Sequence, residues 1–357
     1  MRIMHVMASR ADGGAETYAA DVIESLHAAG ISQLAVVPRA SRHHQRLSAA
    51  GVTLAEGVLD VPLGAWRRRK LAEASDGFRP DLVHCWMRRA ASLAPPVTAP
   101  LVGWFGGYYD PSRFRGCRHF IAVTPAIVDH LLARGIPRAC AHYVPTFPTL
   151  EAGPPLDRAR LATSADATVL LALSRLHDKK GLDVLLRALA QLPQCVAWLA
   201  GDGPLKGQLR ALAGRLGVAE RVRWLGWRTD RGALLRAADV CVLPSRFEPF
   251  GTVMLEAWAA ATPLVAAASQ GPAALIRDGD NGLLVPVDDA AALAAAVHRL
   301  AGDPVLKARL IGAGMADYQK EFTREAVTRR LIALYEAIIF EAGALRMANR
   351  AQEHAHE

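Results

Sequence analysis

Two glutamates, Glu248 and Glu256, have seven residues between them in the second half of the chain. Glu248 closely follows an apolar run typical of a buried strand, and Glu256 falls about one turn inside a helix expected to begin near Gly251. Because each carboxylate can accept two hydroxyl hydrogen bonds, we expect Glu248 to face a sugar ring and Glu256 a ribose. The spacing alone also allows Glu248 to be a loop charge and Glu256 a partner of the helix dipole.

The main chain beside these glutamates can bind an anion. If a parallel sheet precedes the helix, the free amides of Gly251, Thr252 and Val253 lie beyond the carboxyl ends of the strands, where they would face a diphosphate. Phe250, directly before them, is assigned to the same donor-binding segment.

Two cations follow another expected strand, Thr168–Leu173, and precede a helix. Fixed at that edge, Arg175 and Lys180 would neutralise the charge that develops on a departing diphosphate. Taken alone, such a pair is more often a solvated surface charge.

Gly13 and Gly14 open the first strand-to-helix loop and are expected to lie against the donor diphosphate or the acceptor. The absence of side chains lets the backbone approach a ligand closely. A dinucleotide fingerprint is the competing interpretation, but the first loop lacks the complete G-x-G-x-x-G and the acidic residue that should follow a second strand.

Apolar runs alternate with segments of helical period along the whole chain, which predicts an α/β protein with parallel sheets. The proline-rich stretch Thr146–Leu156 predicts a linker, so we expect domains at 1–150 and 151–322. Residues 323–357 are expected to form a helix over about 323–340 that returns to the first domain, followed by a polar tail. Strands are expected at 3–7, 34–37, 82–84, 101–103, 120–123, 168–173, 196–200, 222–225, 240–243, 264–266 and 282–285.

The 357 residues carry a formal net charge of +8, most of it within residues 1–150. Part of this excess is Arg67–Lys70, directly after Trp66, which suits an anionic membrane surface or acceptor and equally suits a solvated helix face. No nucleic-acid recognition pattern accompanies it, so no nucleic-acid partner is expected. The five cysteines form no C-x-x-C pair, and no leader or membrane-spanning run is evident. We therefore expect a cytoplasmic enzyme, at most peripheral on the inner membrane face, without disulfides or structural zinc.

The chain resembles the retaining glycosyltransferases of the two-Rossmann GT-B fold, family four, whose signature is two glutamates at this spacing. The other matching segments occur in the family's order: Gly13–Glu16, Ser174–Leu176, Lys179–Gly181, Gly201–Pro204 and Gly279–Val285. The resemblance implies two doubly wound parallel-sheet domains facing across a cleft. It also implies transfer of a sugar from a nucleotide-diphosphate donor to an acceptor hydroxyl, with Arg175 and Lys180 as phosphate ligands. Gly201 and Gly203 form a tight turn of a kind found in many α/β proteins, and the resemblance implies that they line the donor nucleotide's cleft. A donor phosphate oxygen would take the proton, so no metal or other cofactor is expected.

One family feature is missing. Many members carry a histidine after the strand that we place at residues 101–104, whereas this chain has Phe105-Gly106-Gly107-Tyr108-Tyr109. His84, expected at the end of the preceding strand, matches another family position and is predicted to contact the sugar or acceptor, although a structural role is as common for such a residue.

The segment from Phe105 to Ile121 resembles bacterial transferases that build lipopolysaccharide and related envelope glycans, which implies a glycan or glycolipid acceptor. Two other functions stay open: a nucleotide-sugar epimerase or hydrolase on the same fold, and a non-catalytic subunit that binds sugar nucleotides.

Overall fold

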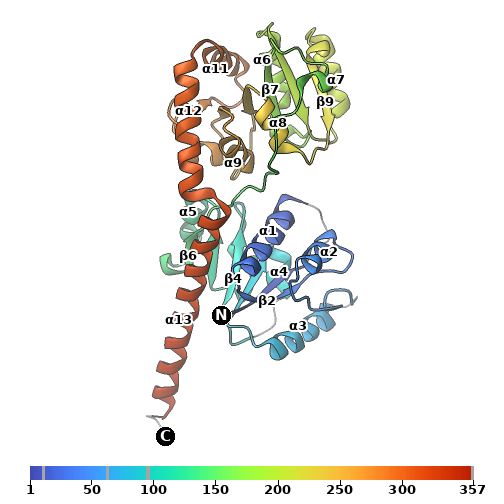
Figure 1. Cartoon of the computed structure of the whole chain (residues 1–357). Coiled ribbons are helices and arrows are strands. Elements are labelled where there is room, and N and C mark those ends of the chain that lie inside the picture. The colour runs from blue at the N-terminus through green and yellow to red at the C-terminus, as the bar shows by residue number, and fades with distance from the viewer. Residues whose placement is uncertain (10–12, 62–63, 94–96, 355–357) are drawn as a thin grey trace. The chain divides into compact units, whose positions relative to one another are not determined.

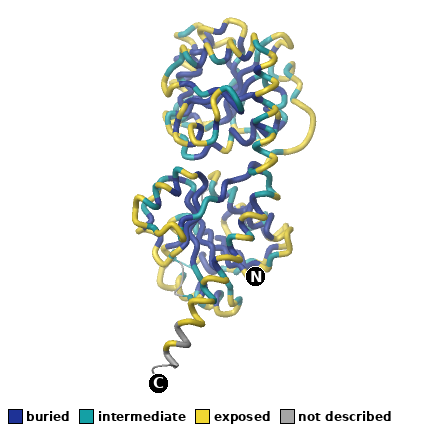
Figure 2. The backbone as a smooth tube through the Cα atoms, turned by 90° about the vertical axis from the view of Figure 1, so that its left-hand side faces the viewer, coloured by how far each residue is buried: buried dark blue, intermediate teal, exposed yellow. Residues whose placement is uncertain are grey.

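The computed structural model describes residues 1–9, 13–61, 64–93 and 97–354. The chain divides into two compact units, Met1–Thr146 together with Arg324–Glu357 (unit 1) and Phe147–Thr323 (unit 2). These units divide the chain after Thr146 and Thr323, within four residues of the boundaries expected after residues 150 and 322. In both units a buried core is surrounded by exposed loops and helix faces (Figure 2).

Unit 1 contains a six-stranded parallel sheet in the order β2-β1-β3-β4-β5-β6. Helices pack around this sheet (Figure 1). Its strands are β1 (Arg2–Met7), β2 (Ser32–Val36), β3 (Leu82–Trp86), β4 (Leu101–Phe105), β5 (His119–Ala122) and β6 (Ala141–Tyr143). Its helices are α1 (Gly14–Ala28), α2 (Arg42–Ala49), α3 (Gly64–Phe78), α4 (Met87–Leu93), α5 (Pro125–Ala133) and α13 (Arg324–His354). The strands are short apolar runs because a parallel sheet is buried on both faces.

The last helix, α13, is longer than predicted. It runs to His354 rather than ending near Phe340, so the expected end of the helix is wrong and the polar segment from residue 342 to His354 is helical. The residues after Phe340 are largely good helix formers with no proline, and polarity by itself does not end a helix. Thr328 of α13 hydrogen-bonds Ser25 of α1 (Oγ1···Oγ 2.6 Å), which fixes α13 within unit 1. No helix in the described part of the chain is long and apolar enough to cross a membrane.

Unit 2 contains a second six-stranded parallel sheet, in the order β12-β11-β10-β7-β8-β9. Its strands are β7 (Thr168–Leu173), β8 (Cys195–Ala200), β9 (Val222–Gly226), β10 (Val240–Leu243), β11 (Leu264–Ala267) and β12 (Leu283–Val285). Its helices are α6 (Leu182–Ala190), α7 (Lys206–Arg215), α8 (Arg231–Ala237), α9 (Thr252–Ala259), α10 (Gln270–Leu275), α11 (Ala290–Gly302) and α12 (Pro304–Asp317). The chain winds outward from β7 in one direction and from β10 in the other, so the loops after these two adjacent strands diverge at a topological switch point.

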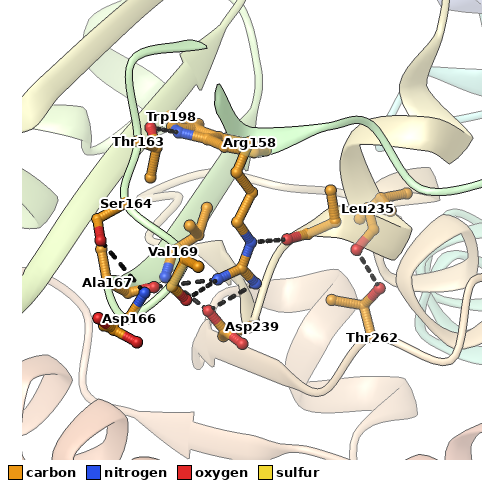
Figure 3. A network of polar contacts seen from close by, with 12 residues as sticks. Arg158, Thr163, Ser164, Asp166, Ala167, Val169, Trp198, Leu235, Asp239 and Thr262 are labelled. Carbon is orange, nitrogen blue, oxygen red and sulfur yellow. Dashed lines mark hydrogen bonds and ion pairs between the residues drawn. The ribbon is translucent and has the colours of Figure 1, made fainter. Parts of the chain in front are cut away.

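A polar network ties the segment before β7 to the start of β7 and β10 (Figure 3). Arg158 donates to the carbonyl of Ala237 (Nε···O 2.9 Å) and pairs with Asp239 (2.9 Å). The same Asp239 oxygen accepts from the amide of Val169 (2.8 Å). The network lies at the amino end of the strands, so it stabilises unit 2 and leaves the opposite edge of the sheet open.

Candidate active site

The loops that follow β7 and β10 pack directly on each other. Gly181 has φ +61°, and a Cβ on it would lie 2.0 Å from the carbonyl oxygen of Pro244, so glycine is required on both counts. The amide of Phe247 donates to the carbonyl of Lys179 (3.2 Å). These contacts hold the two loops in register at the carboxyl edge of the sheet.

The same contact brings together two of the predicted catalytic residues. Lys180 Nζ lies 2.5 Å from Glu248 Oε2, with the lysine side chain 25% and the glutamate side chain 14% exposed. Both side chains are therefore partly shielded but open to a ligand. Because an ammonium has three N–H donors, the bond to Glu248 leaves two for phosphate oxygens.

Arg246 anchors the loop that carries Glu248, a role that the sequence did not reveal. Its guanidinium makes two parallel hydrogen bonds to Asp183 of α6, both 2.8 Å, and its Nε pairs with Asp288 at 2.6 Å. Partial burial acts to raise the pKa of Asp183, but the hydrogen bonds from Arg246 lower it below its ordinary value. The two parallel hydrogen bonds between Arg246 and Asp183 therefore fix the orientation of the loop that carries Glu248.

Glu256 lies on α9 with a different partner. Its carboxyl group is 1% exposed and pairs through Oε1 with Arg231, the first residue of α8. Its other oxygen, Oε2, is buried and has no hydrogen-bond partner among the described residues. Burial raises the pKa of Glu256 to about 7, with Arg231 acting to lower it and Glu151 to raise it further.

The role of Arg231 was not predicted from the sequence. One signal was available: a cation at the first position of a helix is disfavoured by the helix dipole, so its presence there indicates another partner.

The start of α9 has the backbone expected of an anion site. Gly251 has φ +90° and precedes the first helical residue, Thr252, which is exposed, while Val253 is half-buried. The first amides of a helix have no carbonyl partner within it. The side chain of Phe250 is buried, and its carbonyl packs against Gly271. Only its backbone can contribute to the edge of the sheet.

Gly201 and Gly203 pack against the backbone of the loop that follows β7. A Cβ on Gly201 would lie 1.9 Å from the carbonyl oxygen of Ser174, and one on Gly203 would lie 2.4 Å from that of Leu176. These glycines therefore allow the loop after β8 to pack on the loop after β7. That loop also carries Arg175, which is exposed and whose guanidinium forms no ion pair within the described part of the chain.

The remaining predicted site residues lie in unit 1. Gly13 caps α1 and Gly14 is its first residue; residues 10–12, directly before them, lie outside the described residues. A Cβ on Gly13 would lie 2.7 Å from a carboxylate oxygen of Glu16, whereas one on Gly14 would meet nothing within 4 Å.

His84 is not at a strand end, so that expectation is wrong. It is the middle residue of β3, is 1% exposed, and its Nδ1 lies 2.5 Å from the hydroxyl of Tyr335 on α13. Its ring stacks on Trp86 with the centroids 4.2 Å apart. Burial, together with the neighbouring His5, holds the pKa of His84 well below its ordinary value. Within unit 1 this histidine is a neutral core residue.

Both units of the chain resemble known proteins. Residues 167–303 match the family described as Glycosyl transferases group 1, and residues 12–151 match Glycosyltransferase Family 4. Over 343 residues the chain is 33% identical to the lipopolysaccharide core biosynthesis glycosyltransferase LpsE of Rhizobium meliloti, covering 94% of this chain and 98% of that protein. The chain belongs to the group 1 glycosyltransferases of family four.

Two further relatives extend the comparison of this glycosyltransferase. LpsD of Rhizobium meliloti, also a lipopolysaccharide core biosynthesis glycosyltransferase, is 31% identical over the same share of both chains. The crystal structure of Anabaena HepE in complex with UDP-glucose aligns with a TM-score of 0.81 at 23% identity, covering 94% of this chain and all of that one. The fold is GT-B.

At Gly106 the chain has a glycine where the resemblance led us to expect a histidine. A Cβ on Gly106 would lie 2.1 Å from the indole of Trp104, so the tryptophan ring covers the backbone there. Trp104 also lies against the rings of Tyr18 and Trp86. Of the two adjacent tyrosines, Tyr109 is 41% exposed.

Among the described residues, no group of three or more His, Cys, Asp or Glu side chains is placed to hold a metal ion.

Proposed function

We propose that this glycosyltransferase moves a sugar from a nucleotide-diphosphate donor to an acceptor hydroxyl with retention of configuration. The observation that carries the proposal is the pair of Lys180 and Glu248 at the switch point between β7 and β10, beside the first amides of α9. Lys180, Arg175 and these amides would hold the charge that develops on the departing diphosphate, an electrostatic contribution that is commonly the largest in such a reaction.

Chemistry of this kind requires no base from the protein. A donor phosphate oxygen takes the proton of the attacking hydroxyl, Glu248 holds the sugar and Glu256 holds the ribose. We include independence from metal ions in the proposal, since fixed cations and helix amides supply the positive charge that a metal would otherwise provide.

The proposed acceptor is a lipopolysaccharide core or a related envelope glycan. LpsE and LpsD, which match this chain over nearly its full length, are lipopolysaccharide core biosynthesis enzymes. A uridine diphosphate sugar is the first donor to test, because the HepE structure contains UDP-glucose.

We also propose that the enzyme acts in the cytoplasm, at the inner membrane surface. Helix α3 displays Trp66, which is 60% exposed, next to the cations Arg67–Lys70. An aromatic side chain beside a cationic cluster suits an anionic lipid surface. Sedimentation with vesicles that contain anionic lipid tests this: binding should fall in Trp66→Ser and at high salt, and equal binding to neutral vesicles would contradict it.

The activity test uses the purified chain with uridine, guanosine and adenosine diphosphate sugars and truncated core oligosaccharides as acceptors, in the presence of EDTA. Release of nucleoside diphosphate that depends on the acceptor, with an α-linked product from an α-linked donor, supports the proposal. Conversion of the donor without acceptor would indicate the epimerase or hydrolase instead. An inverted product or inhibition by EDTA would contradict the proposed mechanism.

A further inference from the structure

Arg231 connects three parts of unit 2 at the edge where the donor site is proposed. Its Nη1 pairs with Glu256 Oε1, and its Nη2 donates to the carbonyl of Thr149 (3.1 Å) in the segment before β7. The two hydrogen bonds come from opposite nitrogens of one planar group, so they fix its orientation. Because the Arg231 side chain is 39% exposed whereas that of Glu256 is 1% exposed, the cation lies between the buried carboxylate and solvent.

The carboxylate of Glu256 is bound on one side only. Arg231 occupies Oε1, while Oε2 is buried without a hydrogen-bond partner in the described structure. A buried polar atom without a partner is costly, which indicates that a ligand group completes it. The carboxylate oxygen is an acceptor, so the missing group is a donor such as a hydroxyl.

We propose that Arg231 is a positioning residue for donor binding: it holds Oε1 of Glu256 so that Oε2 accepts a hydroxyl of the donor's ribose. The inference rests on the proposed function, because it assumes a nucleotide-diphosphate donor at this edge. Beyond the glutamate pair, it assigns Arg231 a role in donor binding. By holding Glu256, Arg231 would support recognition of the 2′- and 3′-hydroxyls of the ribose.

The charges around Glu256 explain why a cation is needed there. Glu151, in the segment before β7, repels the carboxylate, and the thiol of Cys241 on β10 is also close enough to be affected by it. Arg231 on α8 is the opposite charge that favours the ionised form. Without Arg231 the carboxyl group would be neutral over more of the physiological pH range and would accept hydroxyl hydrogen bonds less strongly.

A control residue lies on the same helix. Arg236 of α8 also holds the segment before β7, donating to the carbonyl of Glu151 (3.1 Å), and no contact between it and Glu256 is found in the described structure. Loss of Arg236 therefore reports on attachment of this segment alone, whereas loss of Arg231 affects the segment and the carboxylate together.

The test compares binding of uridine, guanosine and adenosine diphosphate with binding of each 2′,3′-dideoxy analogue, by calorimetry at pH 8. The native chain should bind at least one of the three and prefer it to its dideoxy analogue by about tenfold or more, the value of a hydrogen bond to a charged group. Arg231→Gln and Glu256→Gln should each lose most of that preference, the double variant should lose no more, and Arg236→Gln should retain it.

The possible failures are distinguishable. If the native chain binds none of the three diphosphates, the proposed function fails and this inference with it. If the native chain binds and prefers the ribose form, but Arg231→Gln retains the full preference, only the role of Arg231 is contradicted. Equal loss in Arg231→Gln and Arg236→Gln would show that both act through attachment of the segment, which also overturns the proposal.

Discussion

Lys180 and Glu248 are 68 positions apart in the chain, yet their side chains meet at 2.5 Å because the loops after β7 and β10 leave neighbouring strands at the same edge of the sheet. The pair combines a cation suited to phosphate with a carboxylate suited to hydroxyls.

Removing either member of this pair should impair transfer far more than folding. For Lys180→Met and Glu248→Gln we expect kcat/KM to fall about a hundredfold or more, as for the loss of one electrostatic contact in a preorganised site. The melting temperature should change little, since partly exposed ion pairs contribute little stability. Initial rates with a radiolabelled donor measure this, and a variant with native turnover would remove that residue from the mechanism.

Gly181 should tolerate no side chain. In Gly181→Ala the methyl group would press on the carbonyl of Pro244 at a left-handed φ, so we expect a stability loss of at least about 1–2 kcal/mol together with loss of activity. Gly207 is the matched control, because it is exposed within α7 and a Cβ there meets nothing within 4 Å. Gly207→Ala should be neutral or stabilising by about 0.5–1 kcal/mol. Urea unfolding compares the two, and similar losses in both would refute the packing argument.

Donor binding should depend on pH through Glu256. Its pKa of about 7 means that the carboxyl group becomes ionised as the pH rises through neutrality, and only the ionised form is a strong acceptor for hydroxyls. Affinity for a nucleotide sugar, whose diphosphate does not titrate there, should therefore rise between pH 6 and 8. In Glu256→Gln the affinity should be weaker and independent of pH over this range. A native profile as flat as that of the variant would show that Glu256 does not titrate as expected.

Two neutral histidines should make unit 1 sensitive to acid. Burial lowers the pKa of His5 to about 3 and that of His84 well below 6.5, whereas in the unfolded chain both titrate near 6.5. The unfolded state therefore binds more protons below pH 6.5, so both histidines destabilise unit 1 as the pH falls, and His5 alone should cost about 2 kcal/mol between pH 6.5 and 5. Hydrogen exchange of unit 1 peptides across this range measures the loss. His5→Asn should reduce the slope, and an unchanged slope would contradict the assignment.

The strands of both sheets were largely predictable, because a strand buried on both faces is an uninterrupted apolar run. β6 was missed, since Ala141–Tyr143 is only three residues long at the sheet edge and contains a histidine and a tyrosine. Of the site, Glu248 and Lys180 were predicted as functional from motif spacing, but their direct pairing is a consequence of strand order.

Contacts between distant segments were beyond the sequence. Arg231 is 25 positions from Glu256 and Arg246 is 63 from Asp183, and no local pattern joins either pair. The packing role of the motif glycines was likewise not predicted, and their expected place in the donor site stays a prediction. Gly201 and Gly203 are required by the backbone of the loop after β7, a contact that depends on β7 and β8 being neighbours.

In the proposed function, a nucleoside diphosphate binds in unit 2 at the switch point between β7 and β10. Hydrogen exchange with mass spectrometry, with and without saturating uridine, guanosine or adenosine diphosphate, locates the ligand directly. Protection should be strongest in peptides that cover residues 174–182 and 245–256 and should disappear in Lys180→Met at the same ligand concentration. Protection confined to other segments, or none with any of the three diphosphates, would contradict the account.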